Sequence, residues 1–233
     1  MTVPFAVLAS GSGTNMQALL DHADEGAAYR IEVLVADRSC AAEERARGKG
    51  LAVYRVDFSG PGRAVGGEVL RLLRRHRAEG VLLAGFLKLL PAAVCRTYRD
   101  RILNIHPALL PAFGGRGMYG RHVHEAVLGS GATLSGPTIH FVNERYDEGR
   151  ILAQWPVPVR PGDTADTLAA RVLEAEHALY PAAADALARA VAGGWPGRGA
   201  PPSFEWFGTD DAARGTELRE AITGGFGGAR GQA

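Results

Sequence analysis

The sequence contains only two cysteines in 233 residues, Cys40 and Cys95. They are too few for a disulfide framework and do not form the CxxC pair typical of a zinc site. We therefore expect two reduced thiols, the state that cysteines keep in a cytoplasmic protein.

The sequence also lacks an excess of either charge and any long hydrophobic run. Lysine and arginine total 26 residues, aspartate and glutamate total 25, and the net charge is +1. This balance argues against a nucleic acid or an anionic membrane as partner. The most apolar stretch, Val81–Cys95, is interrupted by Lys88 and Pro91 and is shorter than the roughly 20 residues that span a bilayer. Met1–Ala9 has no basic start and does not resemble a signal peptide.

Hydrophobic residues make up 46% of the chain, which excludes general disorder. Short apolar runs alternate with helical patterns in the first half. This alternation predicts an α/β fold with a Rossmann-like, mostly parallel twisted sheet and helices on both faces. The expected strands are Val3–Ala9, Ile31–Ala36, Ala52–Val56, Val81–Ala84 and Ile102–Ile105, and the expected helices are Asn15–Glu25, Ala41–Gly48, Val65–Arg77 and a short one after Pro91.

The pattern changes after His106. A loop rich in proline and glycine occupies residues 107–120, and a helix is expected near Val123–Leu128. Two β-rich runs follow, Thr138–Val142 and Ile151–Val159. Their short connection favours an antiparallel strand pair near the C-terminal end of the sheet.

Asp163 is the expected N-cap of a long helix that reaches about Val191. We expect residues 1–192 to form one domain. Residues 193–233 are rich in glycine and proline, and we expect a mobile tail there. The sequence leaves open whether the protein is a monomer or a homodimer.

Ser10–Asn15, with the sequence SGSGTN, forms the expected turn between the first strand and the first helix. Glycines let the backbone approach a ligand, and free amides at a helix start attract an anion, so a phosphate is the expected guest. A tight turn without a ligand is one alternative. A dinucleotide site with Asp37 as the ribose-binding acid is another, but Met16 replaces the third glycine of that fingerprint.

Asn104 and His106 lie at the C-terminal end of the expected fifth strand, where ligands bind in open α/β sheets. Strand alternation places both side chains on one face. An amide donor beside an imidazole suits a carbonyl under attack, although a histidine before a proline is also common as a structural residue. Asp147 is either a turn-forming acid or a carboxylate that raises the pKa of His106.

Glu176 falls about 40° from Val172 on the apolar stripe of the last helix, so this carboxylate needs an internal arginine or a ligand amine or hydroxyl as partner. His122 and His124, two residues apart on a helix, point in different directions, and we expect no metal site there. We expect His140 to be a packed or supporting residue and not a base.

Four segments occur together in order, namely Ser10–Asn15, Asn104–Pro111 (NIHPALLP), Asp147–Gly149 and Glu174–Pro181 (EAEHALYP). With them, residues 1–192 resemble the phosphoribosylglycinamide formyltransferase family, folate-dependent enzymes of purine (IMP) synthesis. The resemblance implies direct transfer of a formyl group from the co-substrate 10-formyltetrahydrofolate to the amine of glycinamide ribonucleotide. It implies a tetrahedral intermediate and no metal.

The resemblance also implies catalytic roles. His106 would donate a proton and stabilise the intermediate. Asn104 would bind the developing oxyanion. Asp147 would raise the pKa of His106.

The resemblance implies binding roles for a further set of residues. Glu176 would bind the ribose and amine side of the nucleotide, and Gly13, Thr14 and Asn15 would hold its phosphate. The residues implied to contact the folate are Arg63, Leu87, Lys88, Leu89, Leu90, Asn143, Glu144, Arg145 and Tyr146.

The chain departs from the family pattern at three places. Residues 114–120 make a longer loop than in the shortest members, and we expect a mobile lid. Arg150 stands where a proline is common, and Lys88 replaces a frequent arginine.

Four other functions are alternatives. A methionyl-tRNA formyltransferase would need an extra domain with a basic surface after Gly193. A formyltetrahydrofolate hydrolase would need a regulatory domain before Val3. The others are a dinucleotide oxidoreductase and a non-catalytic nucleotide-binding module.

Overall fold

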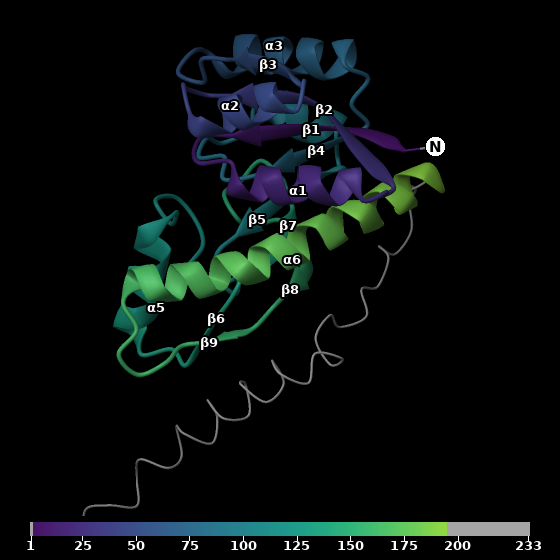
Figure 1. Ribbon diagram of the computed structural model, residues 1–233. Coiled ribbons are helices and arrows are strands. Elements are labelled where there is room, and N and C mark those ends of the chain that lie inside the picture. Colours follow the sequence, from purple (N-terminus) through teal and green to yellow (C-terminus); the bar gives the residue numbers. More distant parts are fainter. Residues whose placement is uncertain (1, 195–233) are drawn as a thin grey trace, which may run out of the picture.

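The buried apolar runs form a twisted central sheet. The computed structural model describes residues 2–194. Its strands are β1 (Val3–Ala9), β2 (Tyr29–Ala36), β3 (Ala52–Arg55), β4 (Gly80–Leu83), β5 (Ile102–His106), β6 (Leu134–Ser135), β7 (Thr138–Phe141), β8 (Ile151–Gln154) and β9 (Val157–Pro158). The main sheet has the order β3-β2-β1-β4-β5-β7-β8 (Figure 1). Strands β1 to β5 run parallel, and β7 and β8 add an antiparallel pair. The predicted fold class is confirmed.

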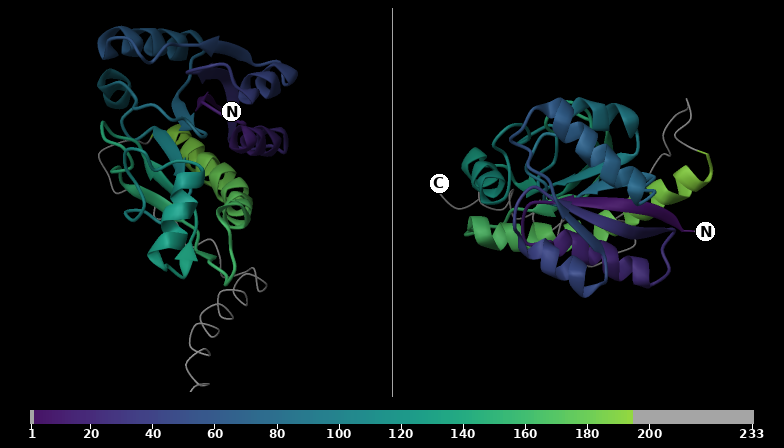
Figure 2. Two further views of the ribbon diagram at one scale, coloured as in Figure 1. Left: turned by 90° about the vertical axis from the view of Figure 1, so that its left-hand side faces the viewer. Right: turned by 90° about the horizontal axis from the view of Figure 1, so that it is seen from above.

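Helices cover both faces of this sheet (Figure 2). They are α1 (Thr14–Asp24), α2 (Ala41–Gly48), α3 (Gly62–Arg75), α4 (Ala92–Thr97), α5 (Arg121–Ser130) and α6 (Ala165–Ala192). Apolar residues of α1, α2 and α6 form one core cluster with the sheet, and those of α3 and α4 form a second on the opposite face. A third cluster joins α5 to the first half of α6.

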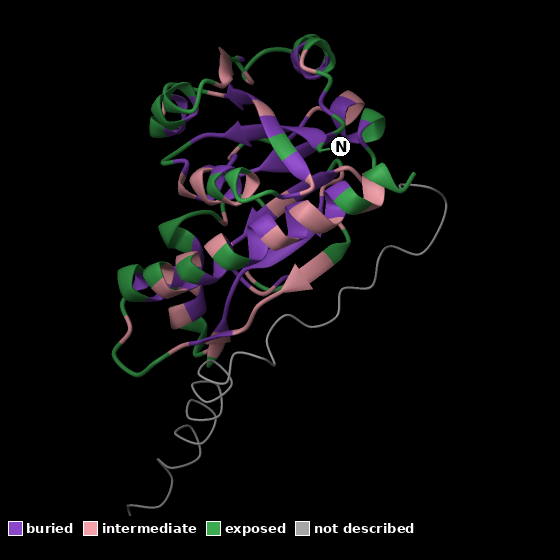
Figure 3. Cartoon of the chain, turned by 45° about the vertical axis from the view of Figure 1, so that its right-hand side comes forward, coloured by how far each residue is buried: buried purple, intermediate pink, exposed green. Residues whose placement is uncertain are grey.

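The central strands are covered on both sides, which explains their continuous apolar runs. Every residue of β1 and of β4 is buried. Figure 3 shows the same burial along the strands in the middle of the sheet. A parallel strand between two helix layers has no solvent face, so it lacks the alternation of a half-exposed strand.

The last β-rich run differs from the prediction, because residues 151–159 form two strands in two sheets. The backbone of Trp155 crosses so close to Gly136 that a Cβ atom on this glycine would lie 1.8 Å from the Trp155 carbonyl oxygen. Pro156 follows and has no amide hydrogen for a ladder. The chain therefore leaves β8, and β9 pairs with β6 in a separate two-stranded sheet.

The N-cap of α6 also differs from the prediction by one residue. Thr164 caps the helix through a reciprocal capping box with Thr167. Asp163 instead accepts hydrogen bonds from the guanidinium of Arg171 and from the Arg160 amide. A carboxylate just before a helix start can cap the helix or pair with a nearby cation, and Asp163 pairs with Arg171.

Helix α6 is anchored to β4 and β5 by a buried tyrosine. The hydroxyl of Tyr180 lies 3.0 Å from the carbonyl oxygens of both Leu83, the last residue of β4, and Leu103, the second residue of β5. Glu176 lies one turn earlier on the same helix face. The anchor thus sets Glu176 below the carboxyl edge of the sheet.

Helix α6 ends at Ala192, where we expected the domain to end. The predicted mobile tail, residues 193–233, lies outside the described residues except for Gly193 and Gly194. Within residues 2–194, no helix combines the length and the apolar character that a membrane crossing requires.

Candidate active site

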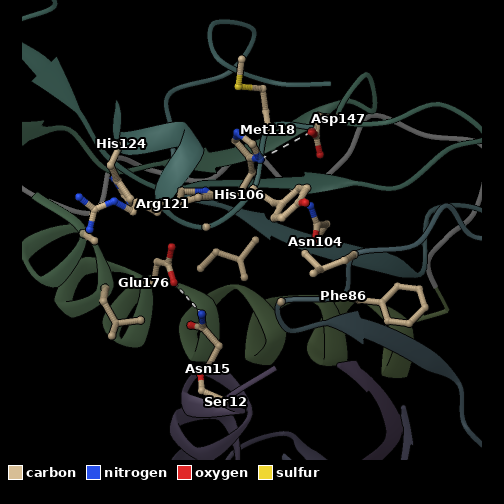
Figure 4. Close-up of a pocket in the computed structure, with 18 of the residues that line it drawn as sticks. Ser12, Asn15, Phe86, Asn104, His106, Met118, Arg121, His124, Asp147 and Glu176 are labelled. Atoms are coloured by element: carbon tan, nitrogen blue, oxygen red, sulfur yellow. Dashed lines mark hydrogen bonds and ion pairs between the residues drawn. The ribbon is translucent and has the colours of Figure 1, made fainter. Parts of the chain in front are cut away.

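A cavity of about 760 Å³ opens at the carboxyl edge of the parallel strands. Its walls come from the turn after β1, the segment after β4, the end of β5, the loop before α5 and the first half of α6 (Figure 4). Open α/β sheets bind ligands at this edge. Of the predicted catalytic and substrate-binding residues, those that line the cavity are Thr14, Asn15, Asn104, His106, Asp147 and Glu176.

His106 and Asp147 meet across this cavity, although they are far apart in the chain. The Nδ1 atom of His106 lies 3.6 Å from an Asp147 oxygen, and its Nε2 lies 2.9 Å from the Phe113 carbonyl oxygen. Both ring nitrogens therefore face acceptors, and only the imidazolium can donate to both. Burial nevertheless lowers the pKa of His106 below its usual value, against the opposing effect of Asp147. Asp147 acts on the pKa of His106 in the expected direction, but burial outweighs it, and a catalytic role for Asp147 stays a prediction.

Asp147 is held in place by its own backbone and by the loop before α5. Its φ angle is 54°, in the left-handed region, and the Gly115 amide donates to it at 2.9 Å. Burial opposes the ionisation of Asp147, but neighbouring groups, His106 and the Gly115 amide among them, keep its pKa below the usual value. The following turn needs Gly149, because a Cβ atom there would lie 1.6 Å from the Phe141 carbonyl oxygen. The turn thus presents an ionised carboxylate to His106.

Asn104 points into the cavity from the same face of β5 as His106, as predicted. Its amide nitrogen lies 3.0 Å from Nε2 of His140 on β7. The amide nitrogen carries two hydrogens, both of which can be donated.

Glu176 is buried beside the cavity and accepts a hydrogen bond from Asn15. The Asn15 amide nitrogen lies 2.6 Å from its carboxylate. Burial raises the pKa of Glu176 to about 7, with Asn15 opposing the shift. Asn15 also has a buried side-chain oxygen with no partner among residues 2–194. The partner of Glu176 is thus an amide and not an internal arginine, and the pair presents an acceptor and a titratable carboxyl to a ligand.

The turn after β1 has the features of an anion site. No side chain of the described residues caps the start of α1, so the first amides of the helix remain without such a partner. Gly13 does not line the cavity. It has a φ of 74°, and a Cβ atom there would lie 2.7 Å from Cα of Ala42 in α2. Glycine at this position is explained by helix packing, which the sequence argument from ligand approach did not anticipate.

Comparison with known proteins identifies the family of this chain. A family model described as formyl transferase matches residues 3–184. The chloroplastic phosphoribosylglycinamide formyltransferase of Vigna unguiculata is 46% identical over 186 residues, which are 78% of this chain and 60% of that protein. The crystal structure of the Brucella melitensis phosphoribosylglycinamide formyltransferase superposes with a TM-score of 0.74 at 36% identity, covering 88% of this chain and all of that one. The chain belongs to the phosphoribosylglycinamide formyltransferase family.

Other relatives agree with this membership of the formyltransferase family. Glycinamide ribonucleotide transformylase 1 from Symbiobacterium toebii has a TM-score of 0.75 at 37% identity, with 81% of this chain and 88% of that chain covered. The chloroplastic formyltransferase of Arabidopsis thaliana is 47% identical over 180 residues, or 75% of this chain. This chain spans about three fifths of the length of the two plant relatives, 60% and 62%.

The residues predicted to contact the folate fall into three groups. Leu87 and Tyr146 line the main cavity. Leu89, Leu90 and Glu144 line a neighbouring cavity of about 240 Å³ between α3 and the segment after β4. The residues that line neither of these two cavities are Arg63, Lys88, Asn143 and Arg145.

Several residues that line the main cavity were not predicted. Phe86 belongs to the segment after β4. Because ligands bind at the carboxyl ends of parallel strands, a residue in this segment could have been predicted to line the site. His124 is buried on α5, and its Nδ1 has no partner within the described part of the chain. His122 on the same helix is exposed and faces Glu125, so the two histidines point apart as expected. The loop before α5, expected to be a lid, forms a wall of the cavity through Gly115–Gly120.

The three other predictions about ligands and departures concern a metal, a dinucleotide and Arg150. Within residues 2–194, no group of three His, Cys, Asp or Glu side chains is placed to hold a metal ion. Asp37 does not line the cavity, and it pairs with Arg38 at 2.8 Å. Arg150 stacks its guanidinium 4.1 Å from the ring centre of Phe141, which gives this substitution a packing role.

Proposed function

We propose that this chain transfers a formyl group from 10-formyltetrahydrofolate to the amine of glycinamide ribonucleotide, a step of purine (IMP) synthesis. The observation that carries the proposal is the meeting of His106, Asp147 and Asn104 in one cavity with the uncapped start of α1. An anion site at one end and an acid–base pair at the other suit a phosphorylated substrate whose amine reacts. The names of the relatives supply the identity of that substrate.

The turn after β1 would hold the substrate phosphate. The amides of Thr14 and Asn15 open α1, and the helix dipole adds a partial positive charge there. Ser12, Thr14 and Asn15 all line the cavity. A phosphomonoester on these amides places the ribose next to the Asn15–Glu176 pair.

That pair would bind the ribose. The unpartnered oxygen of Asn15 accepts a hydrogen bond, and an ionised Glu176 accepts a second. Sugar hydroxyls donate both. Binding in this manner satisfies a buried polar atom that the described residues leave without a partner.

The reaction would take place between Asn104 and His106. The amine nitrogen forms a bond to the formyl carbon, and the bond from this carbon to the folate nitrogen breaks in a second step. In the tetrahedral intermediate the former carbonyl oxygen is negatively charged, and the Asn104 amide donates to it. His106 delivers a proton to the departing folate nitrogen, with Asp147 stabilising its charged form, and the proton that leaves the amine restores the charged His106.

The folate would occupy the side of the cavity formed by Leu87 and Tyr146 and extend toward the smaller cavity. The walls of that cavity include Phe58, Leu89 and Leu90 and so offer an apolar surface to an aromatic ring system. Phe58, which lines the smaller cavity, makes a T-shaped contact with Phe86, which lines the main one, and their ring centres are 5.0 Å apart. We propose no contact for Arg63, Lys88, Asn143 or Arg145, which line neither cavity.

The wider setting is part of the proposal. The partners would be these two small molecules and not a nucleic acid or a membrane, and the protein would be a monomer or a homodimer in the cytoplasm. Cys40 and Cys95 are both free thiols, which is consistent with a reducing compartment.

A direct assay tests the proposed function. Purified protein mixed with both substrates should remove the formyl group from the folate, followed by absorbance, only when glycinamide ribonucleotide is present. His106→Ala should lower kcat by about two to three orders of magnitude, while calorimetry still detects nucleotide binding. His122→Ala removes an exposed histidine of α5 and serves as the control. Activity of the His106 variant within a few-fold of the wild type would refute the acid role.

A further inference from the structure

His140 lies directly behind Asn104 on the neighbouring strand. The two residues are paired across β5 and β7, so their side chains project from the same face of the sheet. Asn104 lines the cavity, whereas His140 is buried and is not among the residues that line it. His140 therefore contacts the amide without facing the substrate.

The hydrogen bonds of His140 determine which ring nitrogen carries the proton. Its Nδ1 lies 2.9 Å from the Phe141 carbonyl oxygen. A carbonyl oxygen only accepts, so Nδ1 must be the protonated nitrogen. Gly149 packs against this contact, since a Cβ atom there would lie 3.3 Å from Nδ1. In the neutral ring, Nε2 is then left with a lone pair.

That lone pair determines the orientation of the Asn104 amide. With Nε2 at 3.0 Å as an acceptor, Asn104 must present its NH₂ group and not its oxygen. The reversed amide would place two lone pairs against each other. One N–H is used by His140, and the second remains available to an oxyanion in the cavity.

Asp147 offers His140 a competing arrangement. One Asp147 oxygen lies 3.5 Å from the same Nε2. A proton on Nε2 would make His140 a donor to Asp147, and the Asn104 amide would have to turn round. The two arrangements make opposite predictions about the tautomer.

We propose that His140 is a positioning residue that holds the Asn104 amide with an N–H directed at the developing oxyanion. The proposal rests on the proposed formyl transfer for its consequence in catalysis. Its structural part, the tautomer of His140, is independent of any activity.

The first test measures the tautomer in the full-length protein labelled with ¹⁵N. Long-range ¹H–¹⁵N correlations distinguish the two ring nitrogens of each histidine, and His140→Gln assigns the signal. We expect His140 to be protonated at Nδ1 and not at Nε2 at neutral pH. A neutral ring protonated at Nε2, or a doubly protonated ring, overturns the proposal even if the enzyme is fully active.

The second test is a double-mutant cycle on formyl transfer. His140→Leu should lower kcat by about tenfold or more with the KM for glycinamide ribonucleotide unchanged, because loss of one oxyanion donor costs about 10²–10³ in kcat and a misdirected donor is a part of that loss. His140→Gln offers an amide oxygen to Asn104 and should recover most of the rate. In an Asn104→Ala background, His140→Leu should cause no further loss.

An equal loss from His140→Leu in both backgrounds would overturn the proposal, because His140 would then act through Asp147 or through the fold. His76→Leu is the matched control, since His76 forms a comparable hydrogen bond, 3.1 Å to the Tyr54 hydroxyl, away from the cavity. If the wild type transfers no formyl group, the proposed function fails, and the tautomer measurement still decides the orientation of Asn104.

Discussion

Two opposing effects act on the proton of His106. Asp147 and the Phe113 carbonyl oxygen favour the charged ring, whereas burial favours the neutral one and outweighs them in this structure. A proton donor in catalysis must be able to gain and lose its proton near the working pH. The carboxylate therefore does not create an unusually basic histidine but limits the effect of burial.

Asp147→Asn should lower the pKa of His106 further, because the imidazolium loses its neighbouring negative charge while burial remains. An NMR titration of the His106 ring measures the change. Glu148→Gln is the control, since this neighbouring carboxylate is exposed and pairs with Arg145 at 3.0 Å. An unchanged pKa in the Asp147 variant would remove Asp147 from the mechanism.

Glu176 should make stability depend on pH. Its pKa is raised to about 7 in the folded protein, from an ordinary value of 4.5, so the unfolded chain releases this proton first as the pH rises. Folding stability therefore falls between about pH 4.5 and 7, by up to about 3 kcal/mol. Glu176→Gln removes this pH dependence. At pH 8 the variant should unfold at a higher urea concentration than the wild type, and at pH 5 the difference between the two urea concentrations should be smaller.

The exposed Glu174→Gln, two residues away on the same helix, is the control for the Glu176 variant. If the difference in unfolding urea concentration between Glu176→Gln and the wild type does not grow with pH, the Glu176 carboxyl is not the group that makes stability fall as the pH rises.

At the scale of elements, the helices and strands could be predicted from the periodicity of apolar residues in the sequence. Contacts between segments that lie far apart in the chain could not. The parallel strands and α1 to α4 follow from local apolar patterns. The division of residues 151–159 between two sheets depends on Trp155 crossing Gly136, a contact without a local signal. The meeting of His106 with Asp147 is similar, because the turn that carries Asp147 is fixed by Gly115 and Gly149. The position of Asn104 and His106 at the cavity was predictable because ligands bind at the carboxyl ends of the strands in this fold.

Gly13→Ala tests the close packing at the start of α1. A Cβ atom there meets the backbone of Ala42, and a φ of 74° costs a residue with a side chain about 1–2 kcal/mol more. We expect a loss of at least about 2 kcal/mol in the free energy of unfolding and weaker phosphate binding.

Gly129→Ala, inside α5 with nothing within 4 Å of the added atom, is the control for Gly13→Ala. It should stabilise the protein by about 0.5–1 kcal/mol. Equal stability of the two variants would contradict the packing argument.

At the scale of the whole molecule, the site depends on α6 reaching across the sheet. Its first half supplies Glu176 to the cavity, and Tyr180 ties its middle to β4 and β5. Its last turns pack Leu187 and Ala188 into the cluster that contains α1. The helix that carries Glu176, the proposed ribose-binding residue, is therefore also a large part of the core, so damage to its C-terminal half should affect both stability and activity.

Two truncations separate the contribution of α6 from that of the residues after it. The described core clusters are built from residues between 3 and 191, and the family model matches residues 3–184. A chain that ends at Gly194 should keep formyl transfer within a few-fold and a melting temperature within about 2–4 °C, the shift that corresponds to 1 kcal/mol in a protein of this size. A chain that ends at Tyr180 loses the buried residues Ala183, Leu187 and Ala188 and should not unfold cooperatively. If the melting temperature of the chain that ends at Gly194 falls by much more than about 2–4 °C, residues 195–233 contribute to stability. The domain boundary would then have to lie beyond α6.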